Sequence, residues 1–140
     1  HILEAVAKTG PELSQDFYRA LAASKDSEAR QEAAEHLAAA PPSDRDRNVV
    51  VLKSLLTDSV LTIRIRAAVG LLLFGDMNGQ NVIMEALNSK REWEQRQTLE
   101  QLARLRNPSQ RGFALARIRA IAADRLVHDE TRRAASQLLK

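Results

Sequence analysis

The sequence has no cysteine, so neither a disulfide nor a thiolate metal site can form within it. It also has no apolar run of about eighteen residues, and we therefore expect no membrane insertion. Aromatic residues are scarce while alanine is abundant, a composition typical of helices that pack closely. The few glycines and prolines cluster at a small number of places, which favours long helices joined by short connections.

The usual signs of catalysis are also missing. Three histidines, His1, His36 and His128, are isolated, and none has a partner at ligand spacing. Residues 76–79 resemble the start of a calcium loop but lack its third oxygen ligand and its distant glutamate. No glycine-rich phosphate loop, Gly-x-Ser-x-Gly motif or pair of buried carboxylates is present. The sequence therefore predicts no enzymatic activity, no metal and no cofactor.

Charge is distributed unevenly along the chain. Residues 1–89 contain nine Lys or Arg against twelve Asp or Glu, a balance of −3, whereas residues 90–140 contain twelve against six, a balance of +6. A basic half favours an anionic partner, either a nucleic acid or an acidic protein surface. The alternative is an arginine-rich but merely solvated helical surface, because the arginines alternate with acidic and apolar positions.

Apolar residues recur at helical spacing, and no convincing strand pattern appears. The central stretch from Leu55 to Asp76 reads LLTDSVLTIRIRAAVGLLLFGD, apolar on nearly all sides yet interrupted by charges. This pattern predicts a helix covered on several sides by neighbours. The expected helices span residues 1–9, 11–24, 28–40, 44–57, 60–74, 81–87, 90–106, 112–126 and 130–140.

The apolar stripes of these helices identify the residues expected to face inward. They are Phe17, Ala20, Leu21, Ala29, Ala33, Ala34, Leu37, Val51, Leu52, Leu55, Leu56, Leu99, Leu102, Ala103, Leu105, Leu115, Ile118, Ile121 or Ala122, and Leu126.

An internal repeat emerges when the second helices of successive helix pairs are aligned. The aligned sets are Ala29, Ile63 and Thr131; Arg30, Arg64 and Arg132; Ala33, Ala67 and Ala135; and Leu37, Leu71 and Leu139. The steps are 34 residues and twice 34. A third unit near Leu99 and Leu102 fits after a slip of about one helical turn. A fixed period of helix–turn–helix units indicates an α-solenoid, in which each pair buries its apolar face against the next.

The segments LLTDSVLTIRIRAAVGLLLFGD, KDSEARQEAAEHL and HDETRRAASQLL resemble HEAT repeats, in particular the short bacterial type of phycobilin-lyase-like proteins. The resemblance implies an all-α, right-handed superhelix of about four antiparallel helix pairs, over units 1–40, 41–76, 77–107 and 108–140 of a longer protein. The third unit departs from the pattern, with Gln95 or Thr98 where arginine is expected. Tetratricopeptide repeats have a similar length, but their characteristic aromatic and Leu-Gly positions are not seen.

In this family the turn aspartate and the helix arginine bind each other or the neighbouring turn. The resemblance therefore implies structural inter-repeat contacts within the pairs Asp26–Arg30, Asp58–Arg64 and Asp129–Arg132.

The favoured function is a non-catalytic scaffold that binds another protein on a concave face lined by the second helices. Trp93 stands out because its helical position falls on a polar stripe. It is either a contact anchor or a residue packed on Met84 or Leu87, and the sequence does not separate these alternatives. The predicted partner-binding residues are Gln31, Glu35, Arg66, Trp93, Arg96 and Glu100.

Two other functions stay open. One is nucleic-acid binding, with phosphate contacts from Arg104, Arg106, Arg111, Arg117, Arg119 and Arg125. The other, implied only by the resemblance, is an accessory domain of a larger enzyme or a lyase acting on a tetrapyrrole.

Overall fold

The computed structural model describes residues 11–140, so the helix expected over residues 1–9 lies outside the described part. Within residues 11–140 the chain forms helices and turns without a strand, which confirms the all-α class. The α-helices are α2 (Pro11–Leu21), α3 (Ser27–Ala38), α4 (Arg45–Leu55), α5 (Leu61–Leu73), α6 (Gln80–Leu87), α7 (Glu92–Leu102), α8 (Leu115–Ala123) and α9 (Asp129–Gln137). Three 3₁₀ segments join them: η1 (Pro42–Asp44), η2 (Met77–Gly79) and η3 (Pro108–Ala114).

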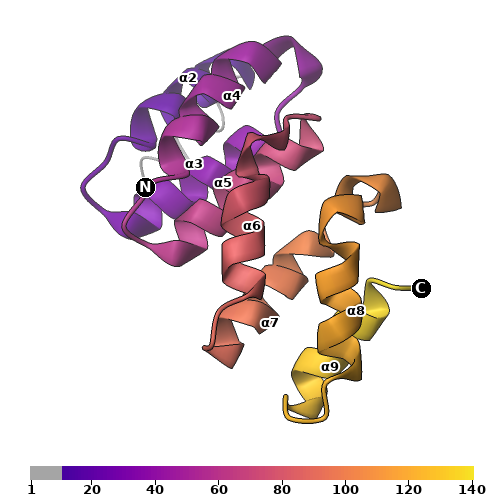
Figure 1. Ribbon diagram of the computed structural model, residues 1–140. Helices are drawn as coiled ribbons and strands as arrows, with labels where there is room; N and C mark the ends of the chain where they lie inside the picture. Colours follow the sequence, from indigo (N-terminus) through magenta and orange to yellow (C-terminus); the bar gives the residue numbers. More distant parts are fainter. Residues whose placement is uncertain (1–10) are drawn as a thin grey trace.

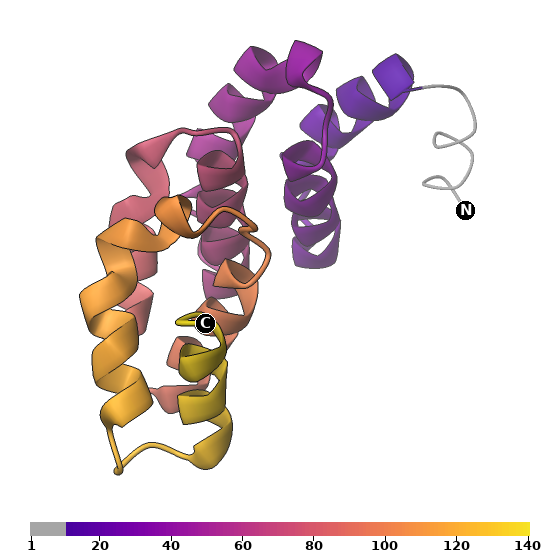
Figure 2. The same ribbon diagram turned by 90° about the vertical axis from the view of Figure 1, so that its right-hand side faces the viewer.

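The helices form four consecutive pairs, α2/α3, α4/α5, α6/α7 and α8/α9, stacked in chain order (Figure 1). The second helices α3, α5, α7 and α9 pack directly on one another, whereas successive first helices make few direct contacts. The second helices therefore form the inner layer of a curved superhelix, and Figure 2 shows the stack from a second side. We call the exposed side of α3, α5, α7 and α9 the inner face.

Helix α5 is the centre of the stack. It contributes Ile63, Ala67 and Leu71 to a buried cluster shared with α2, α3 and α4. Ile65, Ala68, Val69 and Leu72 belong to a second cluster shared with the pairs that follow. Because one helix supplies both cores, it is buried on several sides, as its sequence predicts.

The end of α5 is set by a glycine turn. Gly75 has a φ of 79°, and the amide of Asp76 donates to the carbonyl oxygen of Leu71 at 2.8 Å. This left-handed ending satisfies the last carbonyls of the helix. The carboxylate of Asp76 then accepts from the amide of Asn78 at 2.9 Å, so it begins η2 where the sequence predicts an irregular loop. This hydrogen bond, together with one from the side-chain amide of Asn78, lowers the pKa of Asp76.

Several residues expected in the core are exposed. Leu126 is 94% exposed because α8 ends at Ala123. Asp124 caps the following turn by accepting from the amide of Leu126 at 2.9 Å, so the helical spacing does not extend to Leu126. Ala20 and Ala103 are also exposed.

The buried leucine at the end of the last helix lies one residue away from the position that the repeat predicts. Leu139, aligned with Leu37 and Leu71 in the repeat, is 38% exposed, and the preceding Leu138 is buried instead. Helix α9 ends at Gln137, so Leu139 lies beyond the helix, and the main contacts of α9 are with α7 and α8.

Candidate functional site

In three second helices, a long polar side chain reaches back six residues to a carbonyl oxygen of the preceding turn. The contacts are Arg30 Nη1 to Ser24 O at 3.0 Å, Arg64 Nη1 to Asp58 O at 2.6 Å, and Gln95 Nε2 to Ser89 O at 2.8 Å. A neutral amide thus makes in the third unit the contact that arginine makes in the first two. The recurring contact fixes each turn against its own helix.

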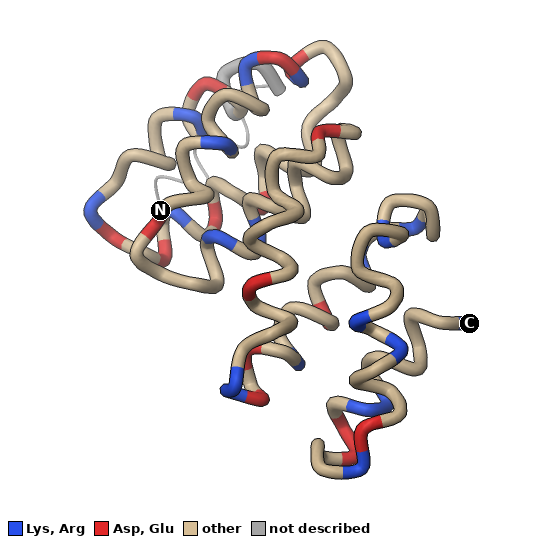
Figure 3. The backbone as a smooth tube through the Cα atoms, viewed as in Figure 1, with Lys and Arg blue, Asp and Glu red and all other residues tan. Residues whose placement is uncertain are grey.

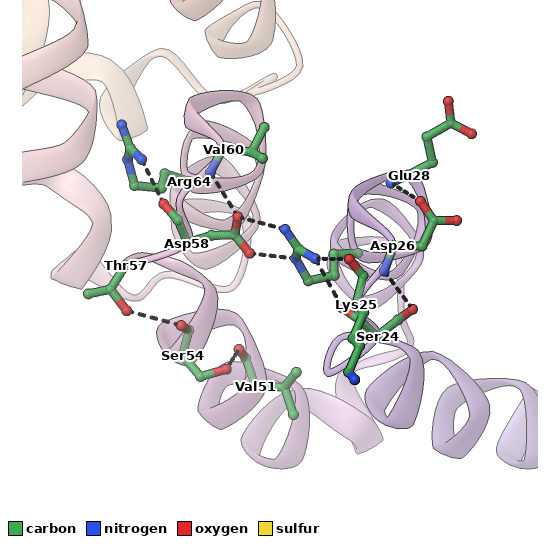
Figure 4. A network of polar contacts seen from close by, with 11 residues as sticks. Ser24, Lys25, Asp26, Glu28, Val51, Ser54, Thr57, Asp58, Val60 and Arg64 are labelled. Carbon is green, nitrogen blue, oxygen red and sulfur yellow. Dashed lines mark hydrogen bonds and ion pairs between the residues drawn. The ribbon is translucent and has the colours of Figure 1, made fainter.

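The carboxylate of Asp58 joins the first unit to the second (Figure 4). Arg30 donates to it from Nε at 2.7 Å and from Nη2 at 3.3 Å, and the amide of Val60 donates at 2.9 Å. Burial opposes ionisation of Asp58, but these hydrogen bonds outweigh it and lower the pKa of the carboxyl group.

The other expected aspartate–arginine contacts differ in part. Arg64 reaches the carbonyl oxygen of Asp58 rather than its carboxylate, which is occupied by Arg30. The carboxylate of Asp26 caps α3 by accepting from the amide of Glu28 instead of pairing with Arg30. Asp129 and Arg132 form an ion pair within the last unit.

Neutralising Asp58 tests the link between units. A group whose folded-state pKa is lowered stabilises the fold above its unfolded pKa of about 4, and this contribution is lost as the pH falls through the folded value. We expect Asp58→Asn to melt below the wild type at neutral pH and the difference to shrink in acid, measured by thermal unfolding from pH 7 downward. Asp46→Asn, at a carboxylate whose side chain is 95% exposed, is the control. A difference that stays constant with pH would contradict the ion-pair assignment.

On the inner face, one carboxylate binds two arginines from different helices. Glu35 on α3 pairs with Arg66 on α5 at 2.8 Å and with Arg104, just after α7, at 2.9 Å. The cluster therefore ties three successive second helices together. It includes two predicted partner-binding residues and one predicted phosphate contact.

The remaining predicted partner-binding residues also lie on inner-layer helices. Trp93 and Glu100 lie on the side of α7 opposite its buried stripe, and both are exposed. Arg96 pairs with Glu130 of α9 at 3.4 Å. Gln31 lies one turn before Glu35 on α3 and is half-buried.

Trp93 is 50% exposed and lies outside both buried clusters. Met84 packs against the second cluster and Leu87 is part of it, whereas Trp93 belongs to neither cluster. The structure thus leaves about half of the largest aromatic side chain in contact with solvent.

The six predicted phosphate contacts do not form one basic row. Arg111 donates to the carbonyl oxygens of Leu105 and Leu138, and Arg117 Nε donates to that of Leu87 at 3.1 Å. Both guanidinium groups therefore stabilise the ends of other helices. Figure 3 shows basic positions spread along the C-terminal pair and mixed with acidic ones near the α8–α9 turn. The remaining four predicted phosphate contacts, Arg104, Arg106, Arg119 and Arg125, are exposed.

One feature was missed by sequence reasoning, an open groove at the α8–α9 turn that we call the turn groove. Its lining residues are Arg96, Arg125, Leu126, Val127, His128, Asp129, Glu130 and Arg133. The helical spacing predicts Leu126 in the core, although Asp124 two residues before it is a turn signal that favours an exposed position.

Within residues 11–140, no helix is long and apolar enough to cross a bilayer, and no three potential metal ligands gather.

No protein-family model matches the sequence, and no curated protein matches it. Among solved structures, the chain is similar to the crystal structure of an engineered protein from the Northeast Structural Genomics Consortium. The two share 20% sequence identity and a TM-score of 0.62, over 98% of this chain and 64% of that one. At this identity the likeness shows the fold alone, and the chain spans about 64% of that protein's length.

Proposed function

We propose that the chain is a non-catalytic scaffold of the HEAT-repeat type that docks another protein on its inner face. The observation that supports this most directly is the position of Trp93. A half-exposed tryptophan on a helix side opposite the core, flanked by charged residues, has the character of a binding anchor. A protein partner would bury the indole that the fold leaves in water.

Ion pairs within the chain already hold several side chains of the inner face in place without a partner. Glu35 holds Arg66 and Arg104, and Arg96 is paired with Glu130. Side chains already held by ion pairs lose little conformational entropy on binding, so less of the contact energy is spent on ordering. Stacked helix pairs present such a surface without a flexible loop.

Substitution of the anchor tests the proposal. We expect Trp93→Ala to weaken partner binding by about 2 kcal/mol or more, because the indole is the largest apolar group available to the partner. Its effect on the melting temperature should be small, because Trp93 lies outside both cores. The partner is first isolated on the immobilised wild-type chain, and its affinity for each variant is then measured by calorimetry.

Val50→Ala is the matched control, since Val50 is a 68% exposed apolar residue on the first helix α4. It should leave the affinity unchanged. Equal affinities for wild type and Trp93→Ala would contradict the inner-face proposal. A large fall in the melting temperature of Trp93→Ala would instead assign the indole to packing.

Nucleic-acid binding has less support. Two of its six candidate arginines are bound to carbonyl oxygens and a third to Glu35. Binding through phosphates weakens steeply with salt, so a duplex DNA and RNA titration at two ionic strengths separates the two functions. Absence of binding at low salt would remove this alternative.

A further inference from the structure

The turn groove combines an unusually exposed leucine with uncompensated positive charge. Leu126 is 94% exposed at its edge, and Val127 beside it is half-buried. The carboxylate of Asp124 holds the turn by accepting from the amide of Leu126. The leucine is therefore displayed by a capped turn rather than by a frayed helix end.

The charges of the groove are only partly balanced within the chain. Glu130 pairs with Arg96 at 3.4 Å, and Asp129 pairs with the neighbouring Arg132. Among residues 15–140, whose side chains the structure describes, no acidic group lies within ion-pair distance of Arg125 or Arg133. Two arginines therefore face the groove with their charges free for a ligand.

The groove is attached to the inner face. Glu92, the first residue of α7, accepts from the amide of His128 at 2.5 Å. The residue after Glu92 is Trp93, and Arg96 lines the groove one turn further along α7. A partner seated on the inner face can therefore extend into the turn groove without leaving the surface.

We propose that the turn groove binds a short acidic segment of a partner protein, with its carboxylates at Arg125 and Arg133 and an apolar side chain against Leu126 and Val127. Charge complementarity selects an acidic ligand. The exposed leucine selects one that also carries an apolar group, since burying apolar surface is favourable. A nucleic acid fits less well. Its continuous row of phosphates would lie next to Asp129 and Glu130, and phosphates provide no apolar group to pack against Leu126.

This inference rests on the proposed protein-binding function and adds a second contact with a stated chemistry. It is tested with a displayed library of short random peptides, selected on the full chain. We expect the wild type to enrich peptides that combine Asp or Glu with Leu, Ile or Phe.

The variant Arg125→Glu/Arg133→Glu should bind the enriched peptides at least about tenfold more weakly, measured by fluorescence anisotropy. Leu126→Ser should weaken them as well, whereas Val50→Ser, an exposed apolar position on α4, should not. All substituted residues are exposed, and equal melting temperatures confirm that the variants are folded.

Two outcomes would overturn the inference. One is a selection with no acidic and apolar enrichment. The other is equal affinity of the enriched peptides for the wild type and the double arginine variant.

Failure of the inner-face proposal gives a different result. In one case, peptides bind Trp93→Ala and the wild type with equal affinity but fail to bind the double arginine variant. This result would support the turn groove independently of the role of Trp93. Peptides lost by Trp93→Ala alone would place recognition on the inner face, leaving the proposed function standing and this inference wrong.

Discussion

Replacement of Leu71 by aspartate is expected to unfold the centre of the protein. Leu71 is completely buried in α5, within the cluster shared by the first two helix pairs. An unpaired charge at such a site costs at least about 3–5 kcal/mol, a large part of the roughly 5–15 kcal/mol that stabilises a whole domain. Far-UV circular dichroism and the urea midpoint measure the loss.

Leu73→Asp is the matched control, two residues further along the same helix. Leu73 is 39% exposed, so its carboxylate keeps access to water and the helix should stay folded. If Leu71→Asp melted like the wild type, the placement of α5 at the centre of the stack would be wrong.

The second large effect is expected from Gly79→Ala. A Cβ atom at Gly79 would lie 2.6 Å from Cα and 2.7 Å from Cβ of Ala68 on α5. Because the contact is with backbone, η2 and α5 must move apart. Overpacking of this kind costs about 1–3 kcal/mol, against the about 0.4–1 kcal/mol gained by restricting the unfolded chain. We therefore expect a net destabilisation, measured by urea unfolding.

Gly112→Ala makes the same chemical change in η3, where an added Cβ meets nothing within 4 Å. It should leave the stability unchanged or slightly higher. Equal losses for the two variants would show that the effect comes from the substitution itself and not from the approach of η2 to α5.

The fold was largely predictable because the repeat shows in the spacing of residues along the sequence. Arg30 and Arg64 lie 34 residues apart and make equivalent contacts to the turn before their helices. The third unit is harder to align from the sequence, because Gln95 follows Arg64 by 31 residues, about one helical turn short of the period. The sequence leaves Gln95 and Thr98 as alternatives for the arginine position, and the carbonyl contact of Gln95 identifies it as the equivalent residue.

The errors at the C-terminal end share a physical cause. Helical periodicity says which side a residue would take if the helix continued, and it does not say where the helix stops. Asp124 ends α8 and leaves Leu126 in solvent, and α9 ends at Gln137, so Leu139 beyond it is exposed.

The candidate site was predictable only as a set of helix faces. The stripe containing Trp93 and Glu100 was identified, and the structure leaves both residues exposed on α7. The pairing of Glu35 with Arg104 was not identified, because these residues are distant in sequence and their meeting depends on how tightly three helices curve. The turn groove depends likewise on how the start of α7 approaches the α8–α9 turn.

The double pairing of Glu35 also bears on the mechanics of the stack. In a solenoid whose units contact only their immediate neighbours, each interface between two units can bend independently of the others. Through Arg66 and Arg104 this single glutamate contacts both the second and the third unit, so we expect it to couple the bending of the first three units. The last unit has no such contact from Glu35. Because half-exposed ion pairs are screened by salt, we expect the coupling of the first three units to weaken as ionic strength rises.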